Sequence, residues 1–273
     1  MTITVSIVLH KTKPDLIFNL AQSLSNEPVE RIFFIDNSPD NSLSNTVKDI
    51  KNSVYLHVPN KGYGNAHNIA INKAFEINSD YHLVLNPDVH WNSTILPLLV
   101  QSMESDKECA LVQPRVVYPD GTLQHTARLL PTPYDVFAKR FLPKFFTAKR
   151  MKKYLLPESA YQNPFNGVYF QGSFLFFKTD ALKQVGLFDE RFFMYPEDID
   201  ISRRIRSAGF SAIYVPHVTI VHNHAAASAK WGKMMWIHIK NMIRYFNKWG
   251  WFFDSERKKL NRRLINELKL RQH

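Results

Sequence analysis

Four groups of side chains in this sequence have the types needed to bind a cation and to move a proton. They are Asp36; Asn86 with Asp88; Glu197 with Asp198 and Asp200; and His222 with His224. Each has a plainer interpretation when taken alone, because an aspartate after a strand often caps a turn or a helix. The chemical interpretation therefore rests on their combination.

Such a combination suits the transfer of a sugar from a nucleotide diphosphate to a hydroxyl group. The leaving diphosphate needs a hard divalent cation on oxygen ligands, and Asp88, at the end of an apolar run, suits that cation. The acceptor hydroxyl needs a carboxylate base, and Asp198, at the start of a predicted helix, suits that role. Asp36 and the loop with Gly62 and Gly64 suit the nucleoside, which shaped loops must hold.

The elements that would position these residues alternate between apolar strands and helices. Predicted strands cover Thr4–Leu9, Arg31–Ile35, Val54–Val58 and Tyr81–Leu85, and predicted helices cover Pro14–Leu24 and Ala66–Glu76. This alternation predicts an α/β fold with a mainly parallel sheet flanked by helices. Ligands of such sheets bind beyond the carboxyl ends of the strands, which is where the polar groups lie.

After about residue 110 the pattern loosens. Predicted strands cover Phe170–Phe177, Ala212–Val215 and Val218–Val221, the last two on either side of Pro216, and predicted helices cover Asp180–Val185 and 196–208. We expect a catalytic domain at 1–229. Its nucleotide-sugar half would be 1–110, and its acceptor half would be 111–229, with a basic and aromatic insertion at 137–157.

Composition and charge narrow the class of protein. The 273 residues are 45% hydrophobic, which is enough for a real core, and the single Cys109 can form neither an internal disulfide nor a cysteine metal site, so a reducing compartment fits best. The run Met1–Leu9 is too short for a signal peptide, and the sequence has no apolar stretch of 18 residues that would span a membrane. The formal charge is +11, and residues 230–273 hold 12 Lys and Arg against 3 Asp and Glu. A basic end on a nearly neutral body favours contact with an anionic surface.

The C-terminal region 230–273 is predicted to be helical and amphipathic. Apolar residues recur at spacings of four and three, at Met235, Ile239, Met242, Phe246, Trp249 and Phe253, and a polybasic cluster follows at Arg257, Lys258, Lys259, Arg262 and Arg263. This pattern predicts binding to the cytoplasmic face of the membrane without crossing it. Packing of the stripe on the catalytic domain or on a twin subunit is the alternative. Two alternatives remain for the insertion at 137–157. It is predicted either to lie over the acceptor site or the membrane surface, or to form a surface flap whose aromatic side chains pack on the body of the protein.

Residues 3–230 resemble the family 2 glycosyltransferases of the GT-A fold, in the branch of rhamnosyltransferases and O-antigen or capsule enzymes. The similar motifs, in order, are Ile7-Val8-Leu9-His10, Ile35-Asp36-Asn37-Ser38, Asn60-Lys61-Gly62-Tyr63-Gly64-Asn65-Ala66-His67-Asn68, Leu85-Asn86-Pro87-Asp88, Pro119-Asp120-Gly121, Gln171-Gly172-Ser173, Gly186-Leu187-Phe188-Asp189-Glu190-Arg191-Phe192-Phe193 and Tyr195-Pro196-Glu197-Asp198-Ile199-Asp200.

The resemblance implies a role for each matching residue. Asp88 would bind Mg or Mn beside the donor diphosphate, His222 would be a further metal ligand, and Asp198 would be the general base of an inverting transfer. Asp36 would contact the nucleotide base, and Gly62 and Gly64 would let the loop approach the nucleoside. The remaining donor-side residues would be His10, Asn60, Asn68 and Asn86. The secondary residues on the acceptor side would be Gly172, Glu197, Asp200 and His224.

Two positions depart from the family pattern. Asn86 replaces the first aspartate of the D-x-D motif and lowers the negative charge of the site, and His10-Lys11 stands where the first strand usually ends in Tyr-Asn. The resemblance favours dTDP-L-rhamnose as the donor and a growing glycan or a polyprenyl-pyrophosphate-linked glycan as the acceptor. A uridine-linked hexose or galactofuranose donor, and a polyprenyl-phosphate sugar synthase, are the alternatives within the fold.

Two other classes of protein are less consistent with the sequence. A dinucleotide-binding oxidoreductase would need a longer glycine pattern than Gly62-Tyr63-Gly64, because position 67 is His. A nucleic-acid-binding protein would fit the basic charge, but that charge is concentrated in the C-terminal region and no nucleic-acid-binding motif is present. We therefore expect no nucleic-acid partner and a cytoplasmic enzyme that is peripheral on the inner face of the membrane.

Overall fold

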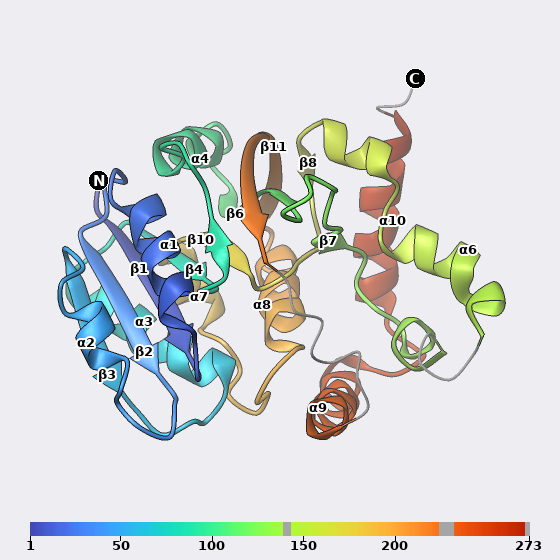
Figure 1. Cartoon of the computed structure of the whole chain (residues 1–273). Helices are drawn as coiled ribbons and strands as arrows, with labels where there is room; N and C mark the ends of the chain where they lie inside the picture. Colours follow the sequence, from blue (N-terminus) through green and yellow to red (C-terminus); the bar gives the residue numbers. More distant parts are fainter. Residues whose placement is uncertain (139–142, 224–231, 271–273) are drawn as a thin grey trace.

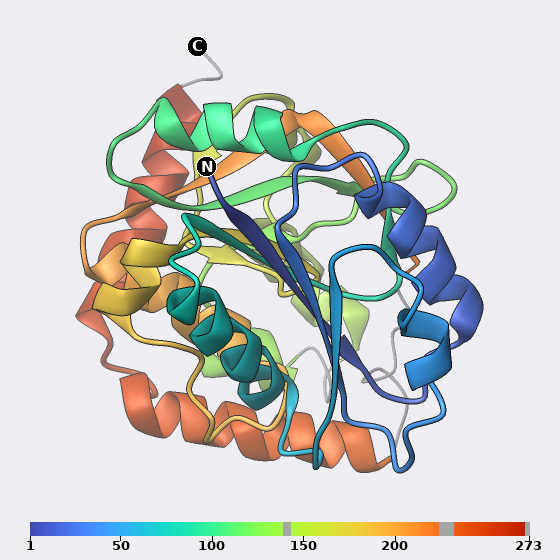
Figure 2. The same cartoon turned by 90° about the vertical axis from the view of Figure 1, so that its left-hand side faces the viewer.

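The computed structural model describes residues 1–138, 143–223 and 232–270. Its first part is the predicted alternation of strands and helices, with one short additional helix, α2, that was not predicted. The elements are β1 (Ile3–Leu9), α1 (Pro14–Leu24), β2 (Arg31–Asp36), α2 (Ser44–Val47), β3 (Ser53–His57), α3 (Tyr63–Glu76) and β4 (Tyr81–Leu85). The strands lie in the order β3-β2-β1-β4 and are all parallel. The prediction of a mainly parallel sheet is confirmed for this half, and the helices cover it in Figures 1 and 2.

The second part extends the same sheet. Its elements are β5 (Val89–His90), α4 (Leu96–Glu104), β6 (Cys109–Val117), β7 (Ala127–Arg128), β8 (Phe165–Asn166), β9 (Tyr169–Phe170), β10 (Phe174–Lys178), α7 (Thr179–Val185), α8 (Glu197–Ser207) and β11 (Ser211–His222). The order continues as β4-β10-β6-β11-β5. Strand β10 is antiparallel to both of its neighbours, whereas β6 and β11 are parallel. The sheet is therefore mixed, and its N-terminal half is parallel.

Two predicted strand boundaries are wrong. The run Phe170–Phe177 contains a break at residues 171–173, so that β9 pairs with β7 in a small second sheet while β10 joins the main one. The two short strands expected around Pro216 form one strand, β11, whose register against β6 shifts between Val215 and Thr219. Proline has no N–H for a ladder bond, so an irregularity at this position lets the strand continue past it.

The insertion and the C-terminal region are helical. They contain η1 (a π-helical turn, Tyr134–Ala138), α6 (Lys144–Tyr154), η2 (a 3₁₀ segment, Glu158–Gln162), α9 (Lys233–Trp249) and α10 (Ser255–Leu270). Both views place α9 across the side of the molecule at which β1 ends (Figures 1 and 2). Among the described residues, no helix is both long and apolar enough to cross a membrane.

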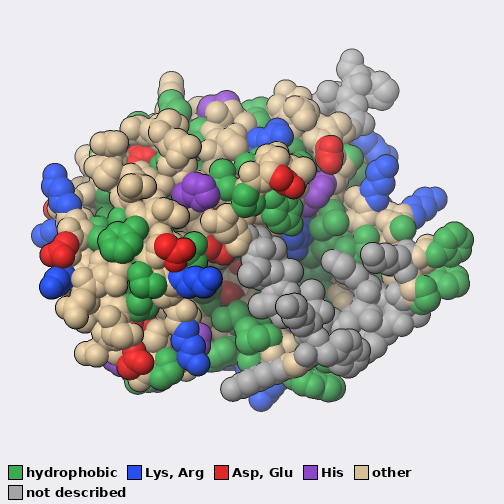
Figure 3. Space-filling model, in the orientation of Figure 1, with side chains coloured by type: hydrophobic (Ala, Val, Ile, Leu, Met, Phe, Trp, Pro, Cys, Tyr) green, Lys and Arg blue, Asp and Glu red, His purple; other side chains and the backbone are tan. Residues whose placement is uncertain are grey.

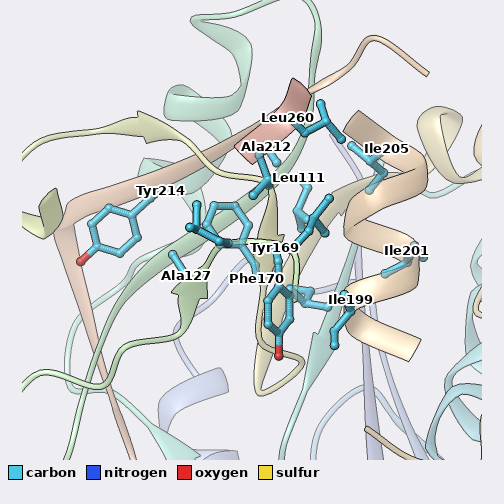
Figure 4. Close-up of a cluster of buried hydrophobic side chains, with 14 of the residues drawn as sticks. Leu111, Ala127, Tyr169, Phe170, Ile199, Ile201, Ile205, Ala212, Tyr214 and Leu260 are labelled. Carbon is cyan, nitrogen blue, oxygen red and sulfur yellow. The ribbon is translucent and has the colours of Figure 1, made fainter. Parts of the chain in front are cut away.

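The apolar stripe of the C-terminal region contributes mainly to the protein core. Met235, Met242 and Phe246 are buried, and the last two belong to the same hydrophobic cluster as Phe170 of β9. Figure 4 shows how that cluster brings together side chains from β6, β7, β9, α8, β11 and α10. For these stripe residues the packing alternative is correct, because their side chains already contact protein. Phe253, at the end of the stripe, is 95% exposed.

A buried ion pair fixes the C-terminal region to α8. The guanidinium of Arg203 donates two hydrogen bonds of 2.7 Å to the carboxylate of Asp254, and both side chains are 2% exposed. The ring of Trp249 lies 4.1 Å from the Arg203 guanidinium carbon, in a cation–π contact. Planar, bidentate pairing of this kind sets orientation as well as distance. The helix that begins with Glu197 and Asp198 is therefore held by residues near the end of the chain.

Candidate active site

The predicted metal residues Asp88 and His222 come together at one end of the sheet. β11 is antiparallel to β5, His222 pairs with Val89, and the Asn223 N–H donates to the carbonyl of Asp88 at 2.9 Å. This pairing places His222 Nε2 3.4 Å from Asp88 Oδ1. Two ligands on neighbouring corners of an octahedral Mg²⁺ sphere lie about 3 Å apart, so the pair has the spacing of adjacent metal ligands.

Gln124 orients His222 and was not found from the sequence. Its side-chain Nε2 donates to the His222 carbonyl at 2.7 Å, and its Oε1 lies 2.9 Å from His222 Nδ1. Because the amide oxygen only accepts, Nδ1 donates to it, and Nε2 is the ring nitrogen that faces Asp88. A metal-binding histidine commonly has this kind of support. Gln124 follows the turn at Pro119-Asp120-Gly121, and nothing in its local pattern marks it as functional.

The two ligands do not complete a cation site by themselves. Within the described ranges, no group of three or more His, Cys, Asp or Glu side chains could hold a metal ion. Asn86, the neutral residue of the Asn-Pro-Asp motif, accepts a 2.9 Å hydrogen bond from the Tyr63 hydroxyl through its Oδ1. A divalent cation on Asp88 and His222 would need further oxygen ligands, and a diphosphate offers them. The donor set fits a cation that is shared with a phosphorylated ligand.

On the nucleotide side, Asp36 is fully buried at the end of β2. Its Oδ1 accepts from the Ser38 N–H at 2.8 Å, and its Oδ2 accepts from the Tyr55 hydroxyl at 2.6 Å. Burial and the Asp36 carboxylate raise the pKa of Tyr55, so this phenol stays protonated. His10 lies beside this segment, with its Nδ1 2.9 Å from the carbonyl of Asn37. Tyr55, which the sequence did not indicate, fixes the orientation of the Asp36 carboxylate.

The glycines of the 60–68 loop make room for protein. Gly62 has φ +110°, and a Cβ there would overlap the backbone of Phe193, while a Cβ on Gly64 would lie 2.9 Å from the Cβ of Phe188. Asn60 caps the loop, because its Oδ1 accepts from the Gly62 N–H at 3.2 Å. The expected close approach to a nucleoside is thus accompanied by a close approach to residues 188–193.

Asn68 fastens the same two segments from inside. Its Oδ1 accepts from the Phe188 N–H at 3.0 Å, and its Nδ2 donates to the Phe188 carbonyl at 2.9 Å and to Glu190 Oε1 at 3.0 Å. The Tyr63 N–H also donates to the Phe193 carbonyl at 2.9 Å. Asn68, predicted on the donor side, therefore has a buried positioning role toward the loop that leads into α8.

Asp198 lies at the start of α8 and faces Gly172. Its Oδ2 accepts from the Gly172 N–H at 2.9 Å, and its Oδ1 accepts from the Ile199 N–H at 2.7 Å. A Cβ on residue 172 would lie 3.5 Å from Asp198 Oδ2, an ordinary van der Waals contact, so Gly172 and this carboxylate are direct neighbours. Burial raises the pKa of Asp198 above its ordinary range. A carboxyl with a raised pKa is the stronger base, which is what proton abstraction requires.

Glu197 is the second carboxyl of this pair and is also buried. Its Oε2 has no hydrogen-bond partner. Burial, and then the neighbouring charge of Asp198, raise the pKa of Glu197. Two adjacent buried carboxyls disfavour double ionisation, so one of them holds a proton over a wider pH range than an exposed carboxyl would.

Tyr63 links the metal side of the site to the base side. Its hydroxyl lies 2.9 Å from Asn86 Oδ1 and 2.7 Å from the carbonyl of Gly172. Asn86 is two residues from Asp88, and the Gly172 N–H binds Asp198. The sequence motif that contains Tyr63 does not indicate a role for it, and the structure shows that this side chain joins the two halves of the site.

The predicted secondary residue Asp200 does not join this arrangement. Asp200 is fully buried on the other side of α8, where its Oδ1 accepts from the Trp249 Nε1–H at 2.7 Å and pairs with Lys248 Nζ at 2.6 Å. Its Oδ2 pairs with Arg204 at 2.9 Å. These contacts anchor α9 to α8. His224 lies outside the described residues.

Comparison with known proteins identifies the family. The model of the family described as Glycosyltransferase like family 2 matches residues 17–247. The N-acetylglucosaminyl-diphospho-decaprenol L-rhamnosyltransferase of Mycobacterium tuberculosis is 29% identical over 229 residues, which cover 78% of this chain and 73% of that protein. The rhamnosyltransferase WbbL of Escherichia coli K12 is 26% identical over 193 residues, covering 67% of this chain and 69% of WbbL.

The solved structures establish the fold. GalNAc-T7 in its crystal structure with UDP, GalNAc and Mn²⁺ superposes with a TM-score of 0.65 at 16% identity, covering 91% of this chain. The chain spans 48%, about half, of that longer protein. With the mixed sheet and its parallel N-terminal half, this likeness confirms the expected GT-A fold. The match over residues 17–247 shows that the chain belongs to the glycosyltransferase-like family 2 and is a glycosyltransferase.

Proposed function

We propose that the protein is an inverting glycosyltransferase that moves L-rhamnose from dTDP-L-rhamnose to a lipid-linked or growing surface-polysaccharide acceptor. The names of the two relatives support the sugar, and the M. tuberculosis name supports an acceptor on a polyprenyl diphosphate. The observation that carries the proposal is the arrangement of Asp88, His222 and Asp198 around Tyr63. It combines two cation ligands and a carboxylate base at the carboxyl ends of the sheet strands.

Asp88 and His222 would hold Mg or Mn beside the donor diphosphate. The bound cation supplies positive charge that neutralises the leaving diphosphate. Gln124 keeps the His222 Nε2 lone pair available for it. Asp36 and the loop from Asn60 to Asn68 would hold the nucleoside, with His10 and Asn86 beside them.

Asp198 would accept the proton of the acceptor hydroxyl. As that O–H bond breaks, the acceptor oxygen forms a bond to the anomeric carbon while the bond from that carbon to the diphosphate oxygen breaks. The nucleoside diphosphate leaves with the bonding electrons, and the anomeric configuration inverts in a single displacement. The Gly172 and Ile199 N–H groups hold the two carboxylate oxygens in place, so little reorganisation is needed during proton transfer.

The lipid-linked acceptor implies where the enzyme works. Polyprenyl-diphosphate acceptors stay in the membrane, so we place the protein at the inner, cytoplasmic face of that membrane as a peripheral enzyme. The basic α6 and the C-terminal helices would then face the lipid side, and the proposal requires no nucleic acid.

A thermal-shift screen of nucleoside diphosphates and nucleotide sugars, with and without Mn²⁺, tests the donor. A ligand that binds only the folded state raises the melting temperature by mass action. We expect the largest Mn²⁺-dependent rise with dTDP and dTDP-L-rhamnose. A larger rise with a uridine nucleotide would indicate that the donor is instead a uridine-linked hexose or galactofuranose. Product analysis with a polyprenyl-diphosphate glycan then tests the acceptor, and a polyprenyl-phosphate sugar as the product would contradict it.

A further inference from the structure

Two pairs of adjacent phenylalanines project from the surface. On α6, Phe145 is 88% and Phe146 is 66% exposed, and between α9 and α10, Phe252 is 72% and Phe253 is 95% exposed. Scattered apolar residues are normal on a protein surface, but large aromatic side chains with so little protein contact are not. Two such pairs require a partner that covers them.

The pairs are connected through η1, which lies between α6 and the α9–α10 junction. The Tyr134 hydroxyl donates to the Phe146 carbonyl at 3.3 Å, and the ring of Phe137 stacks on Trp251, next to Phe252, with centroids 6.2 Å apart. Both α6 and the end of α9 lie on the side of the molecule away from β3 and α2 (Figure 1). Green apolar side chains also stand out over α6 at the right-hand edge of Figure 3. We call residues 145–146 and 252–253 together the phenylalanine surface.

Basic residues flank both pairs. On α6, Lys149, Lys152 and Lys153 are exposed in the turns that follow Phe146. On α10, one hollow of about 330 Å³ is lined by Ser255, Lys258, Lys259, Arg262, Arg263 and Asn266, with no acidic residue among them. The lining of this hollow, which starts two residues after Phe253, is complementary to a layer of anionic groups.

We propose that the phenylalanine surface docks the enzyme onto an anionic lipid bilayer. This inference rests on the proposed lipid-linked acceptor and names the surface that would bring the enzyme to it. The four side chains are protruding tips with basic neighbours, which is how interfacial segments enter the boundary between headgroups and acyl chains. A protein partner would be expected to offer an apolar groove for each tip instead. The buried stripe residues Met235, Met242 and Phe246 have no part in this docking.

Co-sedimentation of the full chain with vesicles tests the proposal. Vesicles of phosphatidylglycerol with phosphatidylcholine are compared with phosphatidylcholine alone, for the wild type and for Phe145→Ser/Phe146→Ser, Phe252→Ser/Phe253→Ser and the fourfold variant. The matched control is Phe18→Ser on α1, since Phe18 is 57% exposed but lies in the nucleotide half. We expect each double variant to need at least roughly tenfold more lipid for half-binding, because insertion into the headgroup boundary buries two aromatic side chains, even if only in part. Phe18→Ser should bind like the wild type.

The charge contribution is tested in the same assay. Lys258→Glu/Lys259→Glu and 0.5 M salt should both weaken binding to the anionic vesicles, because surface charges are screened over a short distance at high salt. Vesicle binding that the phenylalanine variants leave unchanged would overturn the proposal. So would a wild-type dimer that dissociates in the fourfold variant, because the surface would then be covered by a second copy.

Different results would contradict the docking proposal and the proposed function. Toward a water-soluble acceptor with a short alkyl chain, the phenylalanine variants should keep the wild-type turnover, and toward the same glycan on a polyprenyl chain in vesicles they should lose most of it. No transfer by the wild type to either acceptor would contradict the proposed function. Equal turnover of wild type and variants on vesicles would contradict docking alone. Melting temperatures within about 2 °C of the wild type verify that the variants are folded, since surface changes of this kind cost about 0.5 kcal/mol or less.

Discussion

His222 Nε2 lies 3.4 Å from Asp88 Oδ1, although the two residues are far apart in the sequence. The short β5–β11 pairing produces this contact, because it sets Val89 opposite His222. The two ligands can thus be preorganised by backbone pairing before any nucleotide binds.

Asp88→Asn should abolish transfer and leave the fold intact. The Asp88 side chain is 22% exposed, so replacing its carboxylate by an amide should change the melting temperature by little. The Mn²⁺-dependent part of the thermal shift with nucleoside diphosphate should disappear, because a neutral amide is a poor ligand for a hard cation. Full activity of the wild type in excess chelator would rule out this metal site.

Gln124→Ala should lower the affinity for the cation by about 10- to 100-fold, which is the usual effect of removing the hydrogen-bond partner of a metal-binding histidine. The apparent constant for Mn²⁺ should rise while turnover at saturating Mn²⁺ stays near the wild-type value. Gln124→Glu, which can still accept from His222 Nδ1, should recover part of the affinity. A loss of turnover that saturating Mn²⁺ does not restore would contradict a positioning role.

Asp198→Asn should lower turnover by roughly 10² to 10⁴, the range for loss of a general base. Donor binding should persist, because the hydrogen bonds that Asp198 accepts come from Gly172, Ile199 and Tyr169, which lie outside the predicted nucleoside loop. In the wild type, the raised pKa of Asp198 should make the rate increase with pH through a value above that of an ordinary carboxyl. A product that retains the donor's anomeric configuration would overturn the single displacement.

Glu197→Gln should make the protein more stable than the wild type at pH 8 and nearly equal to it at pH 4.5. The folded-state pKa of Glu197 is raised, so the folded protein holds this proton to a higher pH than the unfolded chain does. The free energy of unfolding must therefore fall as the pH rises from about 4 through the raised value. Gln removes that contribution. Parallel urea titrations at the two pH values measure it, and an equal effect at both would contradict the burial argument.

Asp254→Asn should destabilise the protein by about 3 to 5 kcal/mol, because it removes the buried carboxylate that pairs in a bidentate way with the Arg203 guanidinium. The matched control is Glu256→Gln. That carboxylate also contacts Arg203, at 3.4 Å, but is 40% exposed, so its loss should cost about 1 kcal/mol or less. Denaturant unfolding compares the two variants directly. Equal losses in the free energy of unfolding for the two variants would show that burial does not determine how much the Arg203–Asp254 pair contributes to stability.

The parallel half of the fold was predictable because each strand from Ile3 to Leu85 is a short apolar run and Pro14 marks the start of α1, whereas the short helix α2 was not predicted. The placement of β10 between β4 and β6 was not, since a strand's apolar pattern does not specify its neighbours or their direction. The strand break predicted at Pro216 was wrong for a related reason. A proline usually ends a strand, but the shift in register beside it lets β11 continue.

Sequence order and family resemblance placed Asp88, His222 and Asp198 among the candidates. They did not identify the residues that orient the candidate side chains through hydrogen bonds. Gln124, Tyr55 and Tyr63 act through hydrogen bonds to residues distant in sequence, and no local pattern encodes such contacts. Asp200 shows the reverse case. Its acidic type matched the motif, whereas its position on α8 turns it toward Lys248 and Trp249.

The loop between α7 and α8 touches the nucleotide loop at Phe188 and Phe193 and then continues directly into Asp198. A change of position at Tyr63 on donor binding would therefore be passed to the base through a short, hydrogen-bonded backbone path. The two substrates should consequently bind with a coupling free energy. Linkage requires that coupling to be reciprocal: the factor by which the nucleotide tightens the acceptor equals the factor by which the acceptor tightens the nucleotide.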